Sequence, residues 1–220
     1  IALELARNGW QIAIHYNQSA EDASALRQHL RNQGTGAECF QANLAMPDRV
    51  SELLTKVCDR FDDLEAIINS ASIFVRSPML ETSEDMLDRH WQINFRAPYI
   101  LTRDYARRHK RGCIINLLDT KVCRDQYSYS AYLTSKKALR DFTRSAAKEL
   151  APHIRVNGVS PGPILPPPGM PNSYLDDVVE HVPLKRSGTP EEVATAVSFL
   201  LTAPYITGEI INVDGGQHLL

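Results

Sequence analysis

The chain has 220 residues, a net charge of -2 and a pI near 6.4, which suits one α/β domain with a substantial core. Acidic and basic residues are interleaved, so no broad positive field is available to hold nucleic acid or anionic lipid. The four cysteines form no C-x-x-C pair, no apolar run approaches the roughly 20 residues of a membrane span, and the histidines lack metal-ligand spacing. With no signal-peptide pattern at the start, we expect a single cytoplasmic domain over residues 1–220 that binds no metal.

Apolar stretches that look like buried strands alternate with segments of helical period, the pattern of βαβ units that build a parallel sheet. The expected strands are 10–16, 38–42, 64–69, 113–118, 154–159 and 209–213. The expected helices are 1–8, 20–33, 48–61, 84–109, 129–150 and 191–201. The prolines at 161, 163 and 166–168 indicate a substrate-covering loop. The predicted fold class is therefore α/β, a doubly wound, Rossmann-type parallel sheet with helices on both faces and a site at the carboxyl ends of its strands.

The beginning of the chain differs from that of a usual doubly wound sheet. Such a sheet opens with a central strand and a glycine-rich turn whose amides cradle the phosphates of a cofactor, whereas Ile1 to Asn8 read as the tail of a helix. The close pair Gly34 and Gly36 follows a helix instead of opening one, so it is not that turn. We therefore expect the first strand and the glycine-rich turn to lie in about 20 further residues upstream.

The segment with the clearest chemistry contains Tyr132 and Lys136, which lie four residues apart and so share one face of the predicted helix. A nearby ammonium favours the ionised phenol, so we expect Lys136 to lower the pKa of Tyr132 and to allow proton exchange near neutral pH. The spacing alone is common on helices. Here it follows a strand that ends at Asp119 and precedes a strand that ends in Ser160-Pro-Gly-Pro163.

In these motifs the sequence resembles the short-chain dehydrogenase/reductase family over nearly its whole length. Asn69-Ser-Ala-Ser72 is similar to the family's turn after a central strand, and Val213-Asp-Gly-Gly216 is similar to its C-terminal signature. The resemblance implies that Asn94, Tyr132 and Lys136 are catalytic, with Asn94 positioning a water of the proton relay. The family's catalytic serine is replaced by Asp119, which the same comparison places in the site.

Asp119 is the departure that indicates the substrate. A ketone needs hydrogen-bond donors around the oxygen that gains charge, and an ionised carboxylate offers only acceptors. A pterin ring carries N–H donors that a carboxylate can hold, and Asp at this position is a feature of the pteridine reductase and dihydromonapterin reductase branch, which the chain also resembles at 15–20, 69–74 and 143–151. This resemblance implies NADPH-dependent reduction of a C=N bond in a dihydropterin or dihydrofolate-type substrate, with Asp119 orienting the ring or assisting its protonation. The implied substrate-binding residues are Ser72, Phe74, Asp119, Tyr132 and Pro163, with Phe74 stacking on the pterin.

The cofactor expected from the sequence is NADPH. No Asp or Glu occurs between Ile14 and Ala20, where an acidic residue would bind the ribose hydroxyl of NAD and repel the 2′-phosphate of NADP. Two departures from the branch lie nearby, since Gln18 replaces its usual Arg and Asn43 replaces an Asp that often reaches the adenine. The implied cofactor-binding residues are His15, Tyr16, Asn17, Ser19, Asn43, Leu44, Asn69, Ser70, Ala71, Tyr132, Lys136, Pro161, Gly162 and Ile164.

Three alternatives stay open on the sequence alone. The chain could be an NADPH-dependent carbonyl reductase of the 3-oxoacyl-thioester type with Asp119 as an unusual substitution, a non-catalytic scaffold of the same fold, or a portion of a longer enzyme. Asp119 could also serve only to cap a turn, and Phe74 could be a core aromatic. The resemblance further implies a homotetramer, with the helices around Asn94 and Tyr132 at one interface and the C-terminal segment at another.

Overall fold

The computed structural model describes residues 1–123, 126–167, 169, 171 and 173–220. Its strands are β1 (Ile12–Tyr16), β2 (Ala37–Gln41), β3 (Ala66–Asn69), β4 (Gly112–Leu117), β5 (Ile154–Pro161) and β6 (Ile210–Val213), and every pair is parallel. The helices are α1 (Ala2–Arg7), α2 (Ala20–Asn32), α3 (Pro47–Arg60), α4 (Glu84–Trp91), α5 (Ala97–Arg108), α6 (Ser130–Leu150), α7 (Tyr174–Val179) and α8 (Pro190–Thr202). The predicted strands and helices are confirmed to within two residues at each end.

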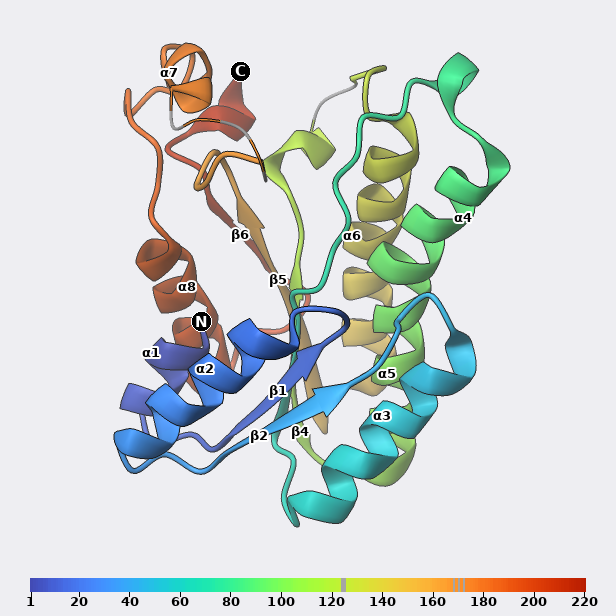
Figure 1. Cartoon of the computed structure of the whole chain (residues 1–220), viewed down its shortest axis with the longest axis vertical. Helices are drawn as coiled ribbons and strands as arrows, with labels where there is room; N and C mark the ends of the chain where they lie inside the picture. The colour runs from blue at the N-terminus through green and yellow to red at the C-terminus, as the bar shows by residue number, and fades with distance from the viewer. Residues whose placement is uncertain (124–125, 168, 170, 172) are drawn as a thin grey trace.

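The helices cover both faces of the strands, as the doubly wound prediction requires. Figure 1 shows α1, α2 and α8 on one face and α3 to α6 on the other. Between α4 and α5 the chain forms a π-helical turn, Gln92–Arg96, and a short 3-10 turn, Thr120–Cys123, follows β4. Within the described residues, no helix has the length and apolar content needed to cross a membrane.

The strands pair in two groups, β1 with β2 and β3 through β6 in sequence order. The facing edges of β1 and β3 are not hydrogen-bonded to each other, and a hollow of about 520 Å³ lies there, lined by side chains such as Trp10, Ile12 and Ile68. The predicted parallel sheet with flanking helices is thus confirmed in its layers and strand direction, and it is divided at this hollow. The expectation of a further strand and a glycine-rich turn stays a prediction.

The rigid centre of the molecule is built by β4 and β5. Helices cover both faces of these strands, and a strand that is buried on both faces carries a continuous run of apolar residues. The fully buried side chains include Ile114, Ile115, Val156 and Val159. Burying each such side chain contributes about 1.5–3 kcal/mol relative to leaving it exposed. This packing fixes the carboxyl end of β4, from which Asp119 follows directly, and so determines where the candidate site lies.

The proline-rich segment after β5 leads into the short helix α7, which begins at Tyr174. Figure 1 shows α7 close to the C-terminus, and the Leu184 N–H donates to the Gly215 carbonyl at 3.1 Å. Pro168, one of the prolines that indicate the loop, lies outside the described residues. The predicted covering of substrate by this segment stays a prediction.

Candidate active site

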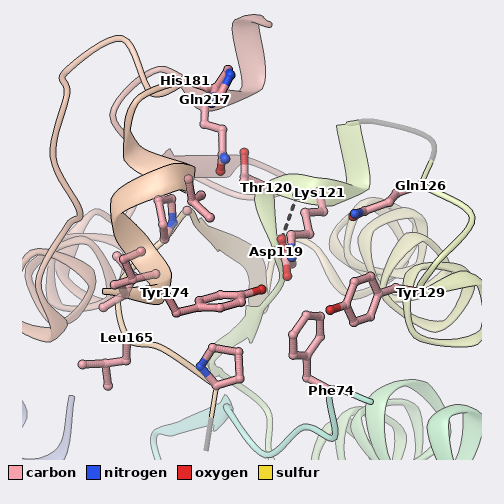
Figure 2. Close-up of a pocket in the computed structure, with 16 residues that line it drawn as sticks. Phe74, Asp119, Thr120, Lys121, Gln126, Tyr129, Leu165, Tyr174, His181 and Gln217 are labelled. Atoms are coloured by element: carbon pink, nitrogen blue, oxygen red, sulfur yellow. Dashed lines mark hydrogen bonds between the residues drawn. The ribbon is translucent and has the colours of Figure 1, made fainter. Parts of the chain in front are cut away.

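A cavity of about 630 Å³ opens at the carboxyl ends of β4 and β5, beside α7. Its walls come from segments far apart in the chain, including Phe74 after β3, Asp119 after β4 and Tyr174 on α7. Figure 2 shows Tyr174 reaching from α7 toward Asp119. The carboxyl ends of parallel strands are the usual place for a ligand in this class of fold, so the cavity is the candidate active site.

Asp119 lines this cavity, and the buried Tyr132 is hydrogen-bonded to it. The Tyr132 hydroxyl donates to Asp119 Oδ2 at 2.7 Å, and the backbone N–H of Lys121 donates to Asp119 Oδ1, also at 2.7 Å. The turn-capping role that the sequence left as an alternative is present, and the role of Asp119 toward a substrate stays a prediction. One oxygen caps the turn after β4, and the other receives the phenol of Tyr132, which lies in the first turn of α6.

The expected effect of Lys136 on Tyr132 is wrong in this structure. Burial, followed by the charge and hydrogen bond of Asp119, raises the pKa of the Tyr132 phenol well above its usual value. The Lys136 ammonium donates to the Leu117 carbonyl at 2.8 Å, so it is turned to the backbone. Burial lowers the pKa of Lys136 to about 8, against the opposing charge of Asp119. Tyr132 therefore stays protonated at neutral pH, and its hydroxyl is hydrogen-bonded to the carboxylate next to it.

Asn94 lies in the π-helical turn and is fully buried. Its Oδ1 accepts from the Ile73 N–H at 2.9 Å and from Ser72 Oγ at 3.1 Å, and its Nδ2 donates to the Ile73 carbonyl at 3.0 Å and to Ser135 Oγ at 3.1 Å. These bonds use both donors and both acceptor sites of the carboxamide. Asn94 therefore holds the turn that precedes Phe74, and it has no hydrogen-bonding group left for the relay water that the resemblance implies.

Phe74 is half-buried and forms part of the cavity wall. Its ring stacks on Tyr129, with centroids 4.6 Å apart and an interplanar angle of 10°, and meets Tyr132 edge to face at 4.8 Å. The alternative of a core aromatic is thus not what the structure shows. Sequence reasoning missed Tyr129 and Tyr174, although Tyr129 precedes Tyr132 by one helical turn. For Tyr174 no local signal existed, because only the fold brings α7 to the cavity.

The segment after β5 completes the wall and joins it to the C-terminus. Gly162 is pressed against Asp214, since a Cβ at Gly162 would lie 2.7 Å from the Asp214 Cα. This close approach lets Pro163 and Ile164 enter the cavity wall. Asp214, from the C-terminal signature, accepts a hydrogen bond from Thr120 Oγ1 at 2.5 Å, so the signature supports the turn that carries Asp119.

The expected cofactor residues follow the carboxyl ends of the strands but are less free than the sequence suggests. His15 Nε2 lies 2.9 Å from the Ala42 carbonyl, Asn43 Oδ1 accepts from the Ala45 N–H, and Asn69 Nδ2 donates to Asn116 Oδ1 at 2.8 Å. Leu44 is buried in the core. Five of the expected cofactor residues line the hollow between β1 and β3: His15, Leu44, Asn69, Ser70 and Ala71.

Lys136 and the segment after β1 both fit a nicotinamide dinucleotide. Lys136 is a fully buried ammonium whose hydrogen bond to Leu117 occupies one of its three donors. Ribose hydroxyls would offer acceptors for the others. No acidic side chain lies in β1 or in the turn 17–19 after it, so a 2′-phosphate would meet no like charge there. Among the described residues, no group of three or more His, Cys, Asp or Glu side chains is arranged to hold a metal ion.

Comparisons with known proteins show which family and which solved structures the chain is similar to. A family model described as enoyl-(acyl carrier protein) reductase matches residues 1–218. The chain is 32% identical to the 3-oxoacyl-[acyl-carrier-protein] reductase FabG of Staphylococcus epidermidis, covering 100% of this chain and 93% of the relative. It is 33% identical to pteridine reductase 1 of Leishmania tarentolae, covering 100% and 91%. Its structure resembles the crystal structure of FolM alternative dihydrofolate reductase 1 from Brucella canis complexed with NADP, with a TM-score of 0.92, 32% identity and coverage of 100% and 88%.

Proposed function

Because the chain belongs to the short-chain dehydrogenase/reductase family of oxidoreductases, we propose that it uses NADPH to reduce a carbon–nitrogen double bond of a pteridine. The observation that carries this proposal is the Asp119 carboxylate, which lies on the floor of an aromatic cavity with the Tyr132 hydroxyl bonded to it. NADPH is supported by the similarity to a Brucella canis protein whose structure contains NADP and by the absence of an acidic side chain after β1.

The carboxylate favours a pteridine for an electrostatic reason. Asp119 offers acceptors, and a pterin ring presents N–H donors on one edge, so the two match. A ketone oxygen that gains negative charge would instead be repelled by Asp119. Phe74, Tyr129 and Tyr174 give the cavity aromatic walls that suit a flat ring. The similarity to pteridine reductase 1 of Leishmania tarentolae supports the same substrate class.

When bound, NADPH supplies the hydride that reaches carbon. The chain's residues then orient the ring and deliver one proton to nitrogen, which completes the addition of two hydrogens across C=N. Asp119 holds the ring by its N–H edge and keeps the Tyr132 proton in place. Tyr132 gives its proton to the ring nitrogen as charge develops there, because its raised pKa keeps it protonated at neutral pH. Lys136 holds the nicotinamide ribose, and Asn94 fixes the turn that carries Phe74.

One second candidate has support, namely reduction of a 3-oxoacyl thioester. It rests on the 32% identity to the Staphylococcus epidermidis reductase over the whole chain. The test follows NADPH oxidation with a dihydropterin, dihydrofolate and an acetoacetyl thioester, for the wild type and for Asp119→Ser. We expect turnover of a pteridine and its loss in Asp119→Ser. Turnover of the thioester alone, preserved or increased in Asp119→Ser, would refute the pteridine proposal.

We also propose that the protein is a homotetramer. Aromatic side chains gather near Asn94 on the outer helices, where Trp91 is 39% and Tyr99 is 42% exposed. The rings of Trp91 and Phe95 lie 4.6 Å apart and are tilted by 45°, and the ring of Tyr99 lies 4.8 Å from that of Phe142 on α6. Exposed aromatic groups of this kind are typical of protein interfaces. Light scattering after size-exclusion chromatography measures the assembly directly, and a monomer at micromolar concentration would exclude it.

A further inference from the structure

Lys121 places a positive charge on the wall of the candidate active site. Its Nζ lies 4.7 Å from the centroid of the Phe74 ring and 5.0 Å from that of Tyr129. The residue is half-buried and lines the cavity, and Figure 2 shows it beside Asp119. Among the residues that the structure describes, no carboxylate oxygen comes within 4 Å of this ammonium. Within the described part of the chain, the contacts of this cation are therefore with aromatic rings.

The position of Lys121 is tied to the catalytic pair. Its backbone N–H donates to Asp119 Oδ1 at 2.7 Å, while the other oxygen of the same carboxylate accepts from Tyr132. The side chain therefore starts from a fixed point two residues after Asp119. A flat ring that stacks on an aromatic face has its centroid about 4.5–7 Å away. Tyr129 covers one face of Phe74, so a substrate ring would stack on the other face, with its edge and first substituent within reach of the Lys121 ammonium, which lies 4.7 Å from the Phe74 centroid.

When a substrate displaces water from the cavity, the Lys121 ammonium lacks an anionic partner of its own. Asp119 is the one acidic side chain among the described lining residues, and its single charge also acts on the buried Lys136 ammonium, so two cations share one carboxylate. His181, also on the wall, uses Nδ1 in a contact with the Asp177 carbonyl at 3.1 Å. A bound ring would remove water from Lys121, and a cation that loses water without gaining a counter-charge is unfavourable. An anionic group on the substrate restores the balance through a charge-assisted hydrogen bond.

We propose that Lys121 makes the site selective for pteridines whose side chain carries an anion, either a carboxylate or a phosphate, over pteridines with a neutral side chain. This inference rests on the proposed function, since stacking of the pteridine on Phe74 is what brings the substituent to Lys121. It names a specificity-determining residue that takes no part in moving the hydride or the proton.

The test compares three substrates under NADPH. They are dihydrofolate, with carboxylates, a dihydropterin with a phosphorylated side chain, and the same dihydropterin with a free hydroxyl. Each is measured with the wild type, Lys121→Met, Lys121→Arg and Lys56→Met. Methionine keeps the length of the side chain and removes its charge. Lys56 is an exposed lysine on α3 that does not line the cavity, so Lys56→Met removes the same charge elsewhere.

In the wild type we expect a higher kcat/KM for at least one anionic substrate than for the neutral dihydropterin. Lys121→Met should lower kcat/KM for that anionic substrate by about tenfold more than for the neutral one, chiefly through KM, as loss of a charge-assisted hydrogen bond predicts. Lys121→Arg should retain the preference, and Lys56→Met should show the wild-type ratio. Added salt should narrow the preference in the wild type, because Lys121 is partly open to solvent.

The outcomes separate this inference from the proposed function. Turnover of the neutral dihydropterin by the wild type supports the proposed function whatever Lys121 does. Equal losses for all three substrates in Lys121→Met, or no preference in the wild type, overturn the inference alone. Failure of the wild type with every pteridine overturns both. The identity of the anionic substrate that responds, dihydrofolate or the phosphorylated dihydropterin, shows whether the site takes a carboxylate or a phosphate.

Discussion

The Tyr132 hydroxyl donates a 2.7 Å hydrogen bond to the Asp119 carboxylate. The phenol donates from the first turn of α6, and the carboxylate accepts from the turn after β4. The charge of the carboxylate raises the pKa of Tyr132. The accepting oxygen also holds the phenol in one orientation. Five substitutions, at this pair and at residues near it, test how the site works.

Asp119→Asn should shift the basic limb of the pH profile of kcat/KM to lower pH. The carboxylate raises the pKa of Tyr132, so its replacement by a neutral amide of the same shape removes one of the causes of that rise. Burial of Tyr132 is unchanged, so part of the rise remains. The profile is measured with the preferred pteridine and compared with that of the wild type. An unchanged basic limb would show that Tyr132 does not set it.

Tyr132→Phe should lower kcat by about 10²–10⁴-fold, the usual contribution of a positioned proton donor. The ring of phenylalanine keeps the edge-to-face contact with Phe74, which has its centroid 4.8 Å away, so substrate stacking should be retained. Steady-state kinetics give the loss, and circular dichroism serves as the control for folding. A variant that keeps most of its kcat would remove Tyr132 from the proton transfer.

Lys136→Met should abolish turnover and change how stability depends on pH. The pKa of Lys136 is lowered from 10.5 to about 8 by burial, so between these values the unfolded chain binds more protons than the folded chain. The free energy of unfolding of the wild type should therefore rise with pH across this window, by an amount on the order of 3 kcal/mol.

Lys136→Met lacks this titration, so the difference between the two proteins isolates it from other ionising groups. At neutral pH the variant should be at least as stable as the wild type, because it does not bury an ammonium. Urea unfolding at several pH values between 7 and 10 measures the effect. A constant difference across that range would contradict it.

Asn94→Ala should loosen the turn before Phe74. The substitution removes four hydrogen bonds and leaves the buried Ser135 hydroxyl and the Ile73 backbone with fewer partners, which destabilises the fold by about 1–3 kcal/mol. We expect KM for the pteridine to rise more than kcat falls, because Phe74 contacts the ring and not the transferred proton. A loss confined to kcat would instead favour the relay role implied by the family resemblance.

Thr120→Val should weaken the link between the site and the C-terminus in a pH-dependent way. Burial of Asp214 opposes ionisation, but hydrogen bonds from Thr120, His218 and the backbone outweigh it and lower the pKa of Asp214 below 3.8. The stability that these bonds contribute is full above the unfolded pKa and is lost as the pH falls through the folded value. Thr120→Val should therefore cost about 1–3 kcal/mol at pH 7 and progressively less below pH about 4. A difference that does not change with pH would contradict this assignment.

The sequence by itself determined the elements and most of the chemistry-bearing residues. Strand and helix positions were predictable because hydrophobic periodicity is a local property of the chain, and β4 and α6 each lie where the pattern indicates. Tyr132 and Lys136 were identified from their spacing and their place after a strand. Asp119 was identified from the family resemblance, because it stands where the family has a catalytic serine, and a carboxylate there changes which substrates can bind.

Only the tertiary structure decided how these residues act. The direction of the Tyr132 pKa depends on which partner each group finds in space, and Lys136 finds the Leu117 carbonyl while Tyr132 finds Asp119. The carboxamide of Asn94 is saturated by a turn some 20 residues earlier in the chain. Tyr174 and the division of the sheet at β1 and β3 are equally non-local. Partners distant in sequence, and the burial they share, set pKa values and free hydrogen-bonding groups, and no local pattern encodes them.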